Sequence, residues 1–275
     1  MDDRSRSYRA IWLSDLHLGT RACQIDALTA FLDAVEFGSL YLVGDIVDLW
    51  SLKRRHYWPA SHADFLRRLV RRAAAGARVV YLPGNHDNLF RDYDGLRFGG
   101  VQIRREAFHR LADGRRMIML HGDEFDAVVN GMPLLSAFGD ACYDFLLWMT
   151  RHLHRARRRL GLRYWSLAAA VKHRVKYICQ FVSDYEARLA AHARVHRAEV
   201  VLTGHIHRPE IRPLGDVLYC NGGDWIENCT ALVEHWDGRL EILHPLRDGL
   251  PAAARRPAAA TPAPEPAVAA MLGLA

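Results

Sequence analysis

The sequence predicts a layered α/β domain that is interrupted by a helical insertion. Short, almost wholly apolar runs recur through the first 120 residues, and each of them ends in polar residues. Runs of this kind are typical of strands that are buried on both faces. Amphipathic stretches with helical spacing lie between them, and strands that alternate with helices are typical of a layered α/β fold. The alternation stops near residue 126 and resumes near residue 199.

The predicted strands of the first half each lead directly into a polar loop, and they cover residues 10–13, 40–43, 79–82 and 117–120. Residues 63–75 are predicted to form a helix, because their apolar positions recur at helical spacing while their arginines fall on the opposite face. Four more strands are predicted at residues 199–203, 217–220, 231–234 and 240–243. The simplest account is a helical insertion at about 126–196 between two halves of one sheet-based domain that spans residues 8–250.

Composition narrows the class of protein. The chain has 275 residues, a formal net charge of +6 and a pI near 9.2, which favour an anionic partner such as a phosphate ester, a nucleic acid or a membrane surface. Five cysteines without a CxxC pair indicate reduced, buried thiols. The first ten residues lack the apolar stretch of a secretory signal, so we expect a cytoplasmic protein. Residues 251–275 contain five prolines among many alanines, and we expect a disordered tail.

The loops that follow the predicted strands contain residue types that bind metal ions. They read Asp15-Leu16-His17, Gly44-Asp45, Gly84-Asn85-His86-Asp87, His121-Gly122 and Gly204-His205-Ile206-His207. In an extended backbone, residues two apart point the same way, so Asp15 and His17 are predicted to face one ion. The two carboxylate oxygens of Asp45 are suited to bridging two ions. Each motif alone has an ordinary structural explanation, since Asn85 by itself would be a turn residue more often than a ligand. Together, all directly after buried strands, they predict a metal centre.

In this order, the motifs resemble those of the calcineurin-like metallophosphoesterase superfamily, and they span residues 11–207. The resemblance implies a layered α/β sandwich with two central sheets flanked by helices and a helical insertion cap. It also implies two divalent ions, with Mn²⁺ as the first expectation and Fe or Zn²⁺ as alternatives. Asp15, His17 and His207 would hold one ion, Asn85, His121 and His205 would hold the other, and Asp45 would bridge them. By the same resemblance, His86 would be an outer-sphere catalytic imidazole that meets the substrate, with Asp87 orienting it.

Within this superfamily, the chain resembles the UDP-2,3-diacylglucosamine diphosphatase branch, which cleaves a pyrophosphate in lipid A synthesis. The run Asn221-Gly222-Gly223-Asp224-Trp225 is similar to a stretch found in that branch, and the insertion resembles its helical cap. Residues 134–153 are more apolar than one helix face requires, and residues 151–176 contain nine Arg or Lys but no Asp or Glu. This pairing predicts a pocket for acyl chains and a peripheral position on the inner face of the cell membrane. A merely solvated basic face is the alternative, and no nucleic-acid-binding motif is present.

One residue departs from that branch. The diphosphatases usually have Arg at the position of His86, whereas the wider superfamily and sister groups of the branch have His. The predicted function is therefore hydrolysis of a phosphate ester or pyrophosphate, on the lipid A precursor or on a related phospholipid. A soluble nucleotide or sugar nucleotide is the second interpretation. A scaffold that keeps the fold without turnover is the third, but the complete set of ligands and the catalytic histidine favour an enzyme.

Overall fold

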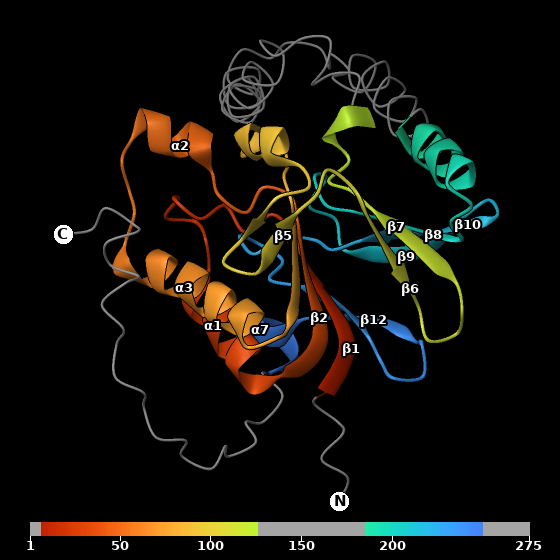
Figure 1. Ribbon diagram of the computed structural model, residues 1–275, viewed down its shortest axis with the longest axis horizontal. Coiled ribbons are helices and arrows are strands. Elements are labelled where there is room, and N and C mark those ends of the chain that lie inside the picture. The colour runs from red at the N-terminus through yellow and green to blue at the C-terminus, as the bar shows by residue number, and fades with distance from the viewer. Residues whose placement is uncertain (1–6, 126–184, 250–275) are drawn as a thin grey trace, which may run out of the picture.

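The strands of the chain form two sheets in the computed structural model, which describes residues 7–125 and 185–249 (Figure 1). The seven-stranded sheet contains, in spatial order, β12 (Leu240–Leu243), β11 (Ala231–Glu234), β1 (Ser7–Leu13), β2 (Glu36–Val43), β3 (Arg78–Leu82), β5 (Val101–Ile103) and β4 (Arg97–Phe98). The five-stranded sheet contains β6 (Ala107–Arg110), β7 (Arg116–Met119), β8 (Val200–Thr203), β10 (Val217–Asn221) and β9 (Glu210–Leu214). The helices are α1 (Ile25–Ala34), α2 (Leu49–Arg54), α3 (Ala60–Ala74), the 3-10 helices η2 (Asn88–Tyr93) and η3 (Asp123–Phe125), an α-helix over residues 185–195, and α7 (Pro245–Asp248).

Each sheet has a parallel centre. Strands β1, β2, β3 and β5 run parallel in the first sheet, and β7, β8 and β10 run parallel in the second. The antiparallel strands lie outside these centres, at β11, β12 and β4 in the first sheet and at β6 and β9 in the second. The carboxyl ends of the central strands of a sheet therefore lie at one edge, where their loops can meet.

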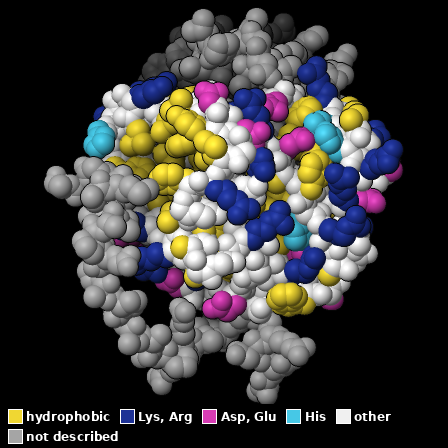
Figure 2. Space-filling model, viewed as in Figure 1, with side chains coloured by type: hydrophobic (Ala, Val, Ile, Leu, Met, Phe, Trp, Pro, Cys, Tyr) yellow, Lys and Arg dark blue, Asp and Glu magenta, His cyan; other side chains and the backbone are white. Residues whose placement is uncertain are grey.

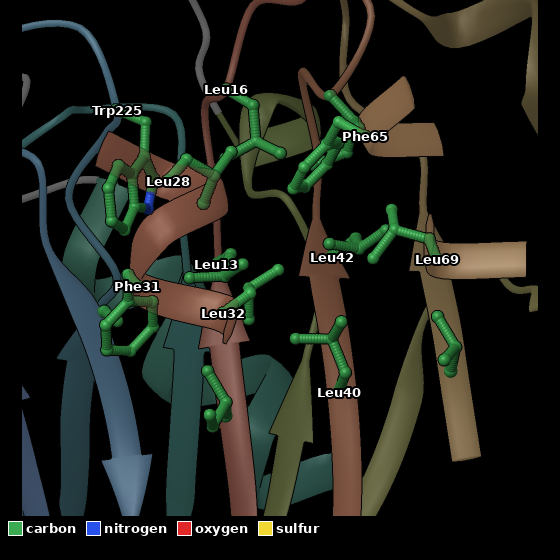
Figure 3. Close-up of a cluster of buried hydrophobic side chains, with 14 of the residues drawn as sticks. Leu13, Leu16, Leu28, Phe31, Leu32, Leu40, Leu42, Phe65, Leu69 and Trp225 are labelled. Atoms are coloured by element: carbon green, nitrogen blue, oxygen red, sulfur yellow. The ribbon is translucent and has the colours of Figure 1, made fainter. Parts of the chain in front are cut away.

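Successive residues of the central strands pack into two different cores. Ile11 and Leu13 of β1 face α1 and α3, whereas Trp12 faces the second sheet. Figure 3 shows the core on the helix side, where Leu40 and Leu42 of β2 lie among side chains of both helices. This two-residue period explains why the strands read as continuous apolar runs: both of their faces are buried.

The second sheet is covered on its outer face by the helix over residues 185–195. Leu189 and Ala193 of this helix pack with Ile118, Val201 and Tyr219. The layers are therefore helices, sheet, sheet and helix, which confirms the predicted sandwich of two sheets flanked by helices. Residues 185–195 had been assigned to the insertion, but they belong to this layered domain. The rest of the predicted cap, residues 126–184, and the predicted tail, residues 251–275, lie outside the described residues.

Three features differ from or extend the sequence interpretation. Both halves of the domain contribute strands to both sheets, because β11 and β12 join the first sheet, and β6 and β7 join the second. Cys23, Cys220 and Cys229 are buried free thiols, as expected for reduced cysteines. Within the residues described, no helix combines the length and apolar character that crossing a bilayer requires.

Candidate metal centre

The loops after β1, β2 and β3 are held together by an extension of the parallel ladders. The amide of Asp15 donates to the carbonyl of Gly44 at 3.0 Å, and the amide of His17 donates to the carbonyl of Asp45 at 2.9 Å. The amide of Gly44 donates in turn to the carbonyl of Leu82 at 2.7 Å. Backbone pairing thus continues past the strand ends and brings the three loops side by side.

Most of the candidate ligands have a left-handed backbone. The φ angles are positive at Asp15 (53°), His17 (49°), Asp45 (52°), His205 (68°) and His207 (51°). Asp15 and His17 were predicted to point the same way because of an extended backbone, and that explanation is wrong. Each residue instead turns its side chain inward from a conformation that costs an L-residue about 1–2 kcal/mol. Strain of this kind accumulates where a site dictates the geometry.

The first group of donors combines Asp15, His17 and His207. Their ligand atoms lie within 4.8 Å of one another, and His207 Nε2 is 3.0 Å from Asp15 Oδ1. His17 Nδ1 lies 3.2 Å from Asp48 Oδ2, which leaves Nε2 pointing toward the group. A carboxylate behind a histidine in this way fixes the ring and raises its basicity as a metal ligand.

The second group surrounds His121. Its Nε2 lies 3.2 Å from Asn85 Oδ1, and its ring centroid is 5.2 Å from that of His205. Its Nδ1 lies 3.3 Å from the carbonyl of Val43, so that carbonyl can take the ring proton and leave Nε2 as a lone-pair donor. The amide of His205 donates to Asp15 Oδ2 at 3.2 Å, which joins this group to the first.

Asp45 lies between the two groups and uses its oxygens differently. Oδ2 is 3.4 Å from His121 Nε2 and 4.0 Å from His17 Nε2. Oδ1 instead accepts from the backbone amide of His86 at 2.8 Å. Oδ1 thus carries one hydrogen bond, while Oδ2 faces both groups. The bridging of two ions by Asp45 stays a prediction.

A sequence model of the calcineurin-like phosphoesterases matches residues 8–209. The chain belongs to this family. It is accordingly a metal-dependent phosphohydrolase, as the motifs predicted, and members of the family use two metal ions.

A UDP-2,3-diacylglucosamine hydrolase of Aeromonas salmonicida is 27% identical over 81% of this chain and 88% of the relative. A UDP-2,3-diacylglucosamine hydrolase of Pseudomonas aeruginosa is 27% identical over 86% of this chain and 99% of the relative. A hypothetical protein of Pyrococcus horikoshii has a solved structure that matches with a TM-score of 0.46, at 13% identity over 86% of this chain and 87% of that one.

The donors of this phosphoesterase fit metal ions. His17 Nε2 is buried and has no hydrogen-bond partner among the described residues, as expected of an atom kept for a cation. Burial works against charging His121, yet the negative charge of Asp45 raises the pKa of that imidazole to about 10. Burial would likewise raise the pKa of Asp45, but the charge of His121 and its neighbours lowers it well below its usual range.

The predicted catalytic residues His86 and Asp87 have different surroundings. His86 Nδ1 lies 3.1 Å from Asp48 Oδ1, and its ring lies under that of Trp50, 4.3 Å between centroids. Its side chain is 25% exposed, so the imidazole can reach a substrate. The expected contact of Asp87 with the His86 ring is not found among the described residues. The carboxylate that can orient His86 is Asp48.

Asp87 fastens the loops instead. Its Oδ1 accepts from the amide of Gly84 at 2.6 Å, and its Oδ2 accepts from the amide of Ile46 at 2.8 Å and from the hydroxyl of Tyr81. Burial and the nearby charge of Asp45 raise the pKa of Asp87. This carboxylate thus ties the loop after β2 to the loop after β3 and sets the distance between their ligands.

Two supporting aspartates were not among the predicted site residues. Asp48, three residues after Asp45 in the sequence, contacts both His17 and His86. Asp224 Oδ2 lies 3.9 Å from His207 Nδ1, and its Oδ1 accepts from three successive backbone amides. Asp224 belongs to the run 221–225 that suggested the branch, so its signal was present but had no structural meaning until the fold placed it behind His207.

The loop glycines provide a first prediction. A Cβ atom on Gly84 would collide with the carboxylate and backbone of Asp45. We expect Gly84→Ala to lower kcat/KM about 100-fold, since an active-site displacement near 1 Å has an effect of that order. Gly38→Ala in β2 is the matched control, because its Cβ would lie 2.9 Å from the Arg9 carbonyl of β1, away from the loops. If both variants lose the same activity, general destabilisation explains the loss and the steric argument is wrong.

Proposed function

We propose that this phosphoesterase hydrolyses the pyrophosphate of an acylated nucleoside-diphosphate sugar, with UDP-2,3-diacylglucosamine as the first candidate. The names of the relatives that match over most of the chain support this substrate. The observation that carries the proposal is an apolar groove that begins beside His86. A soluble sugar nucleotide would have no use for such a groove, whereas an acyl chain needs one.

The groove has a volume of about 540 Å³ and is lined by Leu49, Trp50, Leu52, Lys53, Asn88, Leu89 and Asp92. Two of these apolar side chains are unusually open, since Trp50 is 41% and Leu89 is 56% exposed. Tyr93, Leu96 and Phe98 are also exposed nearby in sequence. Figure 2 shows hydrophobic side chains gathered at the upper left, where Figure 1 places α2. Contiguous exposed apolar surface of this kind commonly marks a ligand groove.

The arrangement assigns a role to each part of the site. Asp15, His17, Asp45 and His207 would hold one ion, and Asn85, His121 and His205 would complete the second with Asp45. Two ions bound there would neutralise the charge of a phosphoryl group and activate water for attack on phosphorus. His86, held by Asp48, would donate a hydrogen bond or proton to a phosphate oxygen or to the leaving group. We propose Mn²⁺ as the native metal, because the donors are carboxylate, imidazole and amide without a thiolate.

A water-soluble nucleotide or sugar nucleotide is the second candidate, and His86 favours it. The diphosphatase branch usually has Arg at this position, and a guanidinium can grip a phosphate with two hydrogen bonds where an imidazole has one. Hydrolysis assays with Mn²⁺, comparing UDP-2,3-diacylglucosamine with UDP-N-acetylglucosamine, which lacks long acyl chains, test the proposal. Higher kcat/KM on the substrate with long acyl chains is expected. A preference for UDP-N-acetylglucosamine would exclude the lipid-linked assignment.

Trp50→Ala tests the groove separately. We expect KM for the acylated substrate to rise about 10-fold or more, because burial of a large apolar side chain contributes about 1.5–3 kcal/mol. The values for a small soluble phosphodiester, bis-p-nitrophenyl phosphate, should change little. Trp236→Ala is the matched control, since Trp236 is 57% exposed and lies after β11, outside the groove. Equal effects of Trp50→Ala on both substrates would mean that the groove does not bind acyl chains.

We also propose peripheral association with an anionic membrane, supported by the basic run at 151–176, which lies outside the described residues. Each Arg or Lys near an anionic surface contributes about 1 kcal/mol. Binding to anionic liposomes should weaken as salt increases. It should fall roughly 100-fold or more in a variant with Gln at Arg157, Arg158 and Arg159, by the same contribution per charge.

The control for that variant has Gln at Arg67, Arg68 and Arg71 of α3, which removes the same charge from a helix of the layered domain. If both variants lose the same amount of liposome binding in co-sedimentation, a general charge effect explains the loss. No binding to anionic liposomes at low salt would contradict the membrane proposal.

A further inference from the structure

A second cluster of metal-binding side chains lies beside the edge strand of the five-stranded sheet. It comprises Glu106, directly before β6, and His192 and His196 of the helix that covers this sheet. Their ligand atoms lie within 4.8 Å of one another. None of the three belongs to the calcineurin-like motifs. Among the described residues, none of them forms a reported contact with the residues of the metal centre.

The distances suit a tetrahedral ion. His192 Nε2 is 3.0 Å from Glu106 Oε2, and His196 Nε2 is 3.8 Å from Glu106 Oε1. A tetrahedral ion with bonds of about 2.0–2.1 Å keeps its ligand atoms about 3.4 Å apart. The two observed separations fall on either side of that value, so small side-chain rotations suffice to admit the ion.

The two histidines are four residues apart, which places them on one face of the helix. The amide of His196 donates to the carbonyl of His192 at 3.2 Å, so the helical turn extends to His196. The turn then closes at Arg197, whose φ is 51°, while the amide of Ala198 donates to the carbonyl of Ala193 at 2.9 Å. This bonding pattern caps the helix end and fixes the backbone of both histidines.

Aromatic rings restrict the imidazoles further. The ring of Phe125 lies 5.2 Å from that of His192, and the ring of Phe108 lies 5.6 Å from that of His196. The imidazoles themselves are 4.5 Å apart between centroids. Side chains held in this way lose little conformational freedom when an ion binds, which favours affinity.

The electrostatic setting also favours a cation. The cluster lies at the C-terminal end of its helix, where the unpaired carbonyls carry partial negative charge. Glu106 adds a carboxylate, and neutral imidazoles complete a donor set that suits Zn²⁺. The side chains are 25% (His192), 30% (His196) and 34% (Glu106) exposed, so water can supply a fourth ligand.

We propose that Glu106, His192 and His196 form a separate site for a single Zn²⁺-class ion. Its role would be to fasten the helix of residues 185–195 to the edge of the second sheet. The ring of Phe125 packs on His192, so the ion would also hold the helix against this part of the chain.

The test is zinc stoichiometry of the metal-depleted, full-length protein at micromolar Zn²⁺. We expect the wild-type protein to bind one more ion than the variant with both His192→Ala and His196→Ala. Zn²⁺ should also raise the Tm of the wild-type protein more than that of the variant, because binding to the folded state alone stabilises it. Co²⁺ should give a tetrahedral absorption spectrum, part of which disappears in the variant.

Two further variants make the result decisive. Glu106→Gln keeps the size of the side chain and removes its charge, and we expect it to weaken zinc binding at this site at least 10-fold. His235→Ala is the matched control: His235 Nε2 lies 2.7 Å from Glu241 Oε2, but its other neighbour is Arg239 rather than a second histidine. His235→Ala should bind as many ions as the wild-type protein.

All these variants should keep the Mn²⁺-supported phosphodiesterase activity, which shows that they fold and separates this site from the proposed catalytic centre. Equal zinc stoichiometry in the wild-type protein, the double variant and Glu106→Gln would overturn the proposal. Filling of the extra site only at millimolar zinc would overturn it as well.

Discussion

Asp45→Ala is expected to reduce hydrolysis to the background rate and to release metal from both halves of the site. Asp45 Oδ2 faces both His17 and His121, so the variant loses a carboxylate that the two groups share. Asp45 Oδ1 also fixes the backbone of His86, so the same change loosens the catalytic loop. Metal analysis of the purified variant, together with kcat on a soluble phosphodiester, measures both effects.

Glu234→Gln is the control for removing a buried carboxylate. Glu234 of β11 is also fully buried in the first sheet, where it accepts hydrogen bonds from Arg9 and the amide of Ala112. We expect it to keep both ions and most activity, at some cost in stability. Metal loss in Glu234→Gln equal to that in Asp45→Ala would show that the ions respond to general loosening, and Asp45 would then not be the bridge.

His86→Ala is expected to keep both ions and to lower kcat about 10²–10⁴-fold, the range for a general acid or base. His86 is the imidazole of the loops that is both exposed beside the groove and held by Asp48. Burial disfavours its charged form, but Asp48 and Asp45 raise its pKa above the ordinary value, which favours a role as proton donor. Metal content equal to that of the wild-type protein, with lost turnover, is the decisive result.

Asp48→Asn tests the proton-donor role of His86, and its metal content must be measured as well because Asp48 also contacts His17. Because Asp48 raises the pKa of His86, its removal should lower that pKa. The fall of kcat at high pH, where His86 loses its proton, should then begin at a lower pH than in the wild-type protein. Metal loss in His86→Ala as complete as in Asp45→Ala would show that His86 is a metal ligand. This outcome is a real test, because His86 Nε2 lies only 3.9 Å from Asp45 Oδ2.

The sequence predicted the buried strands well because their chemistry is local. β1, β2 and β3 present apolar side chains to two cores, which makes each of them an uninterrupted apolar run. The edge strands β4 and β9 gave no such signal. β4 has two exposed residues, and β9 contains Pro213 and no fully buried side chain. The assignment of each strand to one of the two sheets was also not visible, since strand pairing depends on contacts between residues far apart in sequence.

The candidate site follows the same pattern. The convergence of the seven candidate ligands could be predicted because each motif lies directly after a strand, and parallel strands bring such loops together. The roles within the site depend on which loops lie side by side. Asp87 adjoins His86 in sequence but binds the loop after β2, while Asp48 comes from that loop and contacts His86. Adjacency in sequence was therefore a poor guide to the partner of His86.

The left-handed backbone at the ligands has a consequence for directed evolution. At Asp15, His17, Asp45, His205 and His207, a glycine would relieve strain of about 1–2 kcal/mol per residue, while it would remove a ligand. At Asp15 and Asp45, glycine would also remove a buried negative charge. Selection for heat resistance alone should therefore enrich glycine or asparagine at these five positions and yield protein that is more stable but inactive. Only a screen that scores turnover together with stability would retain the native residues.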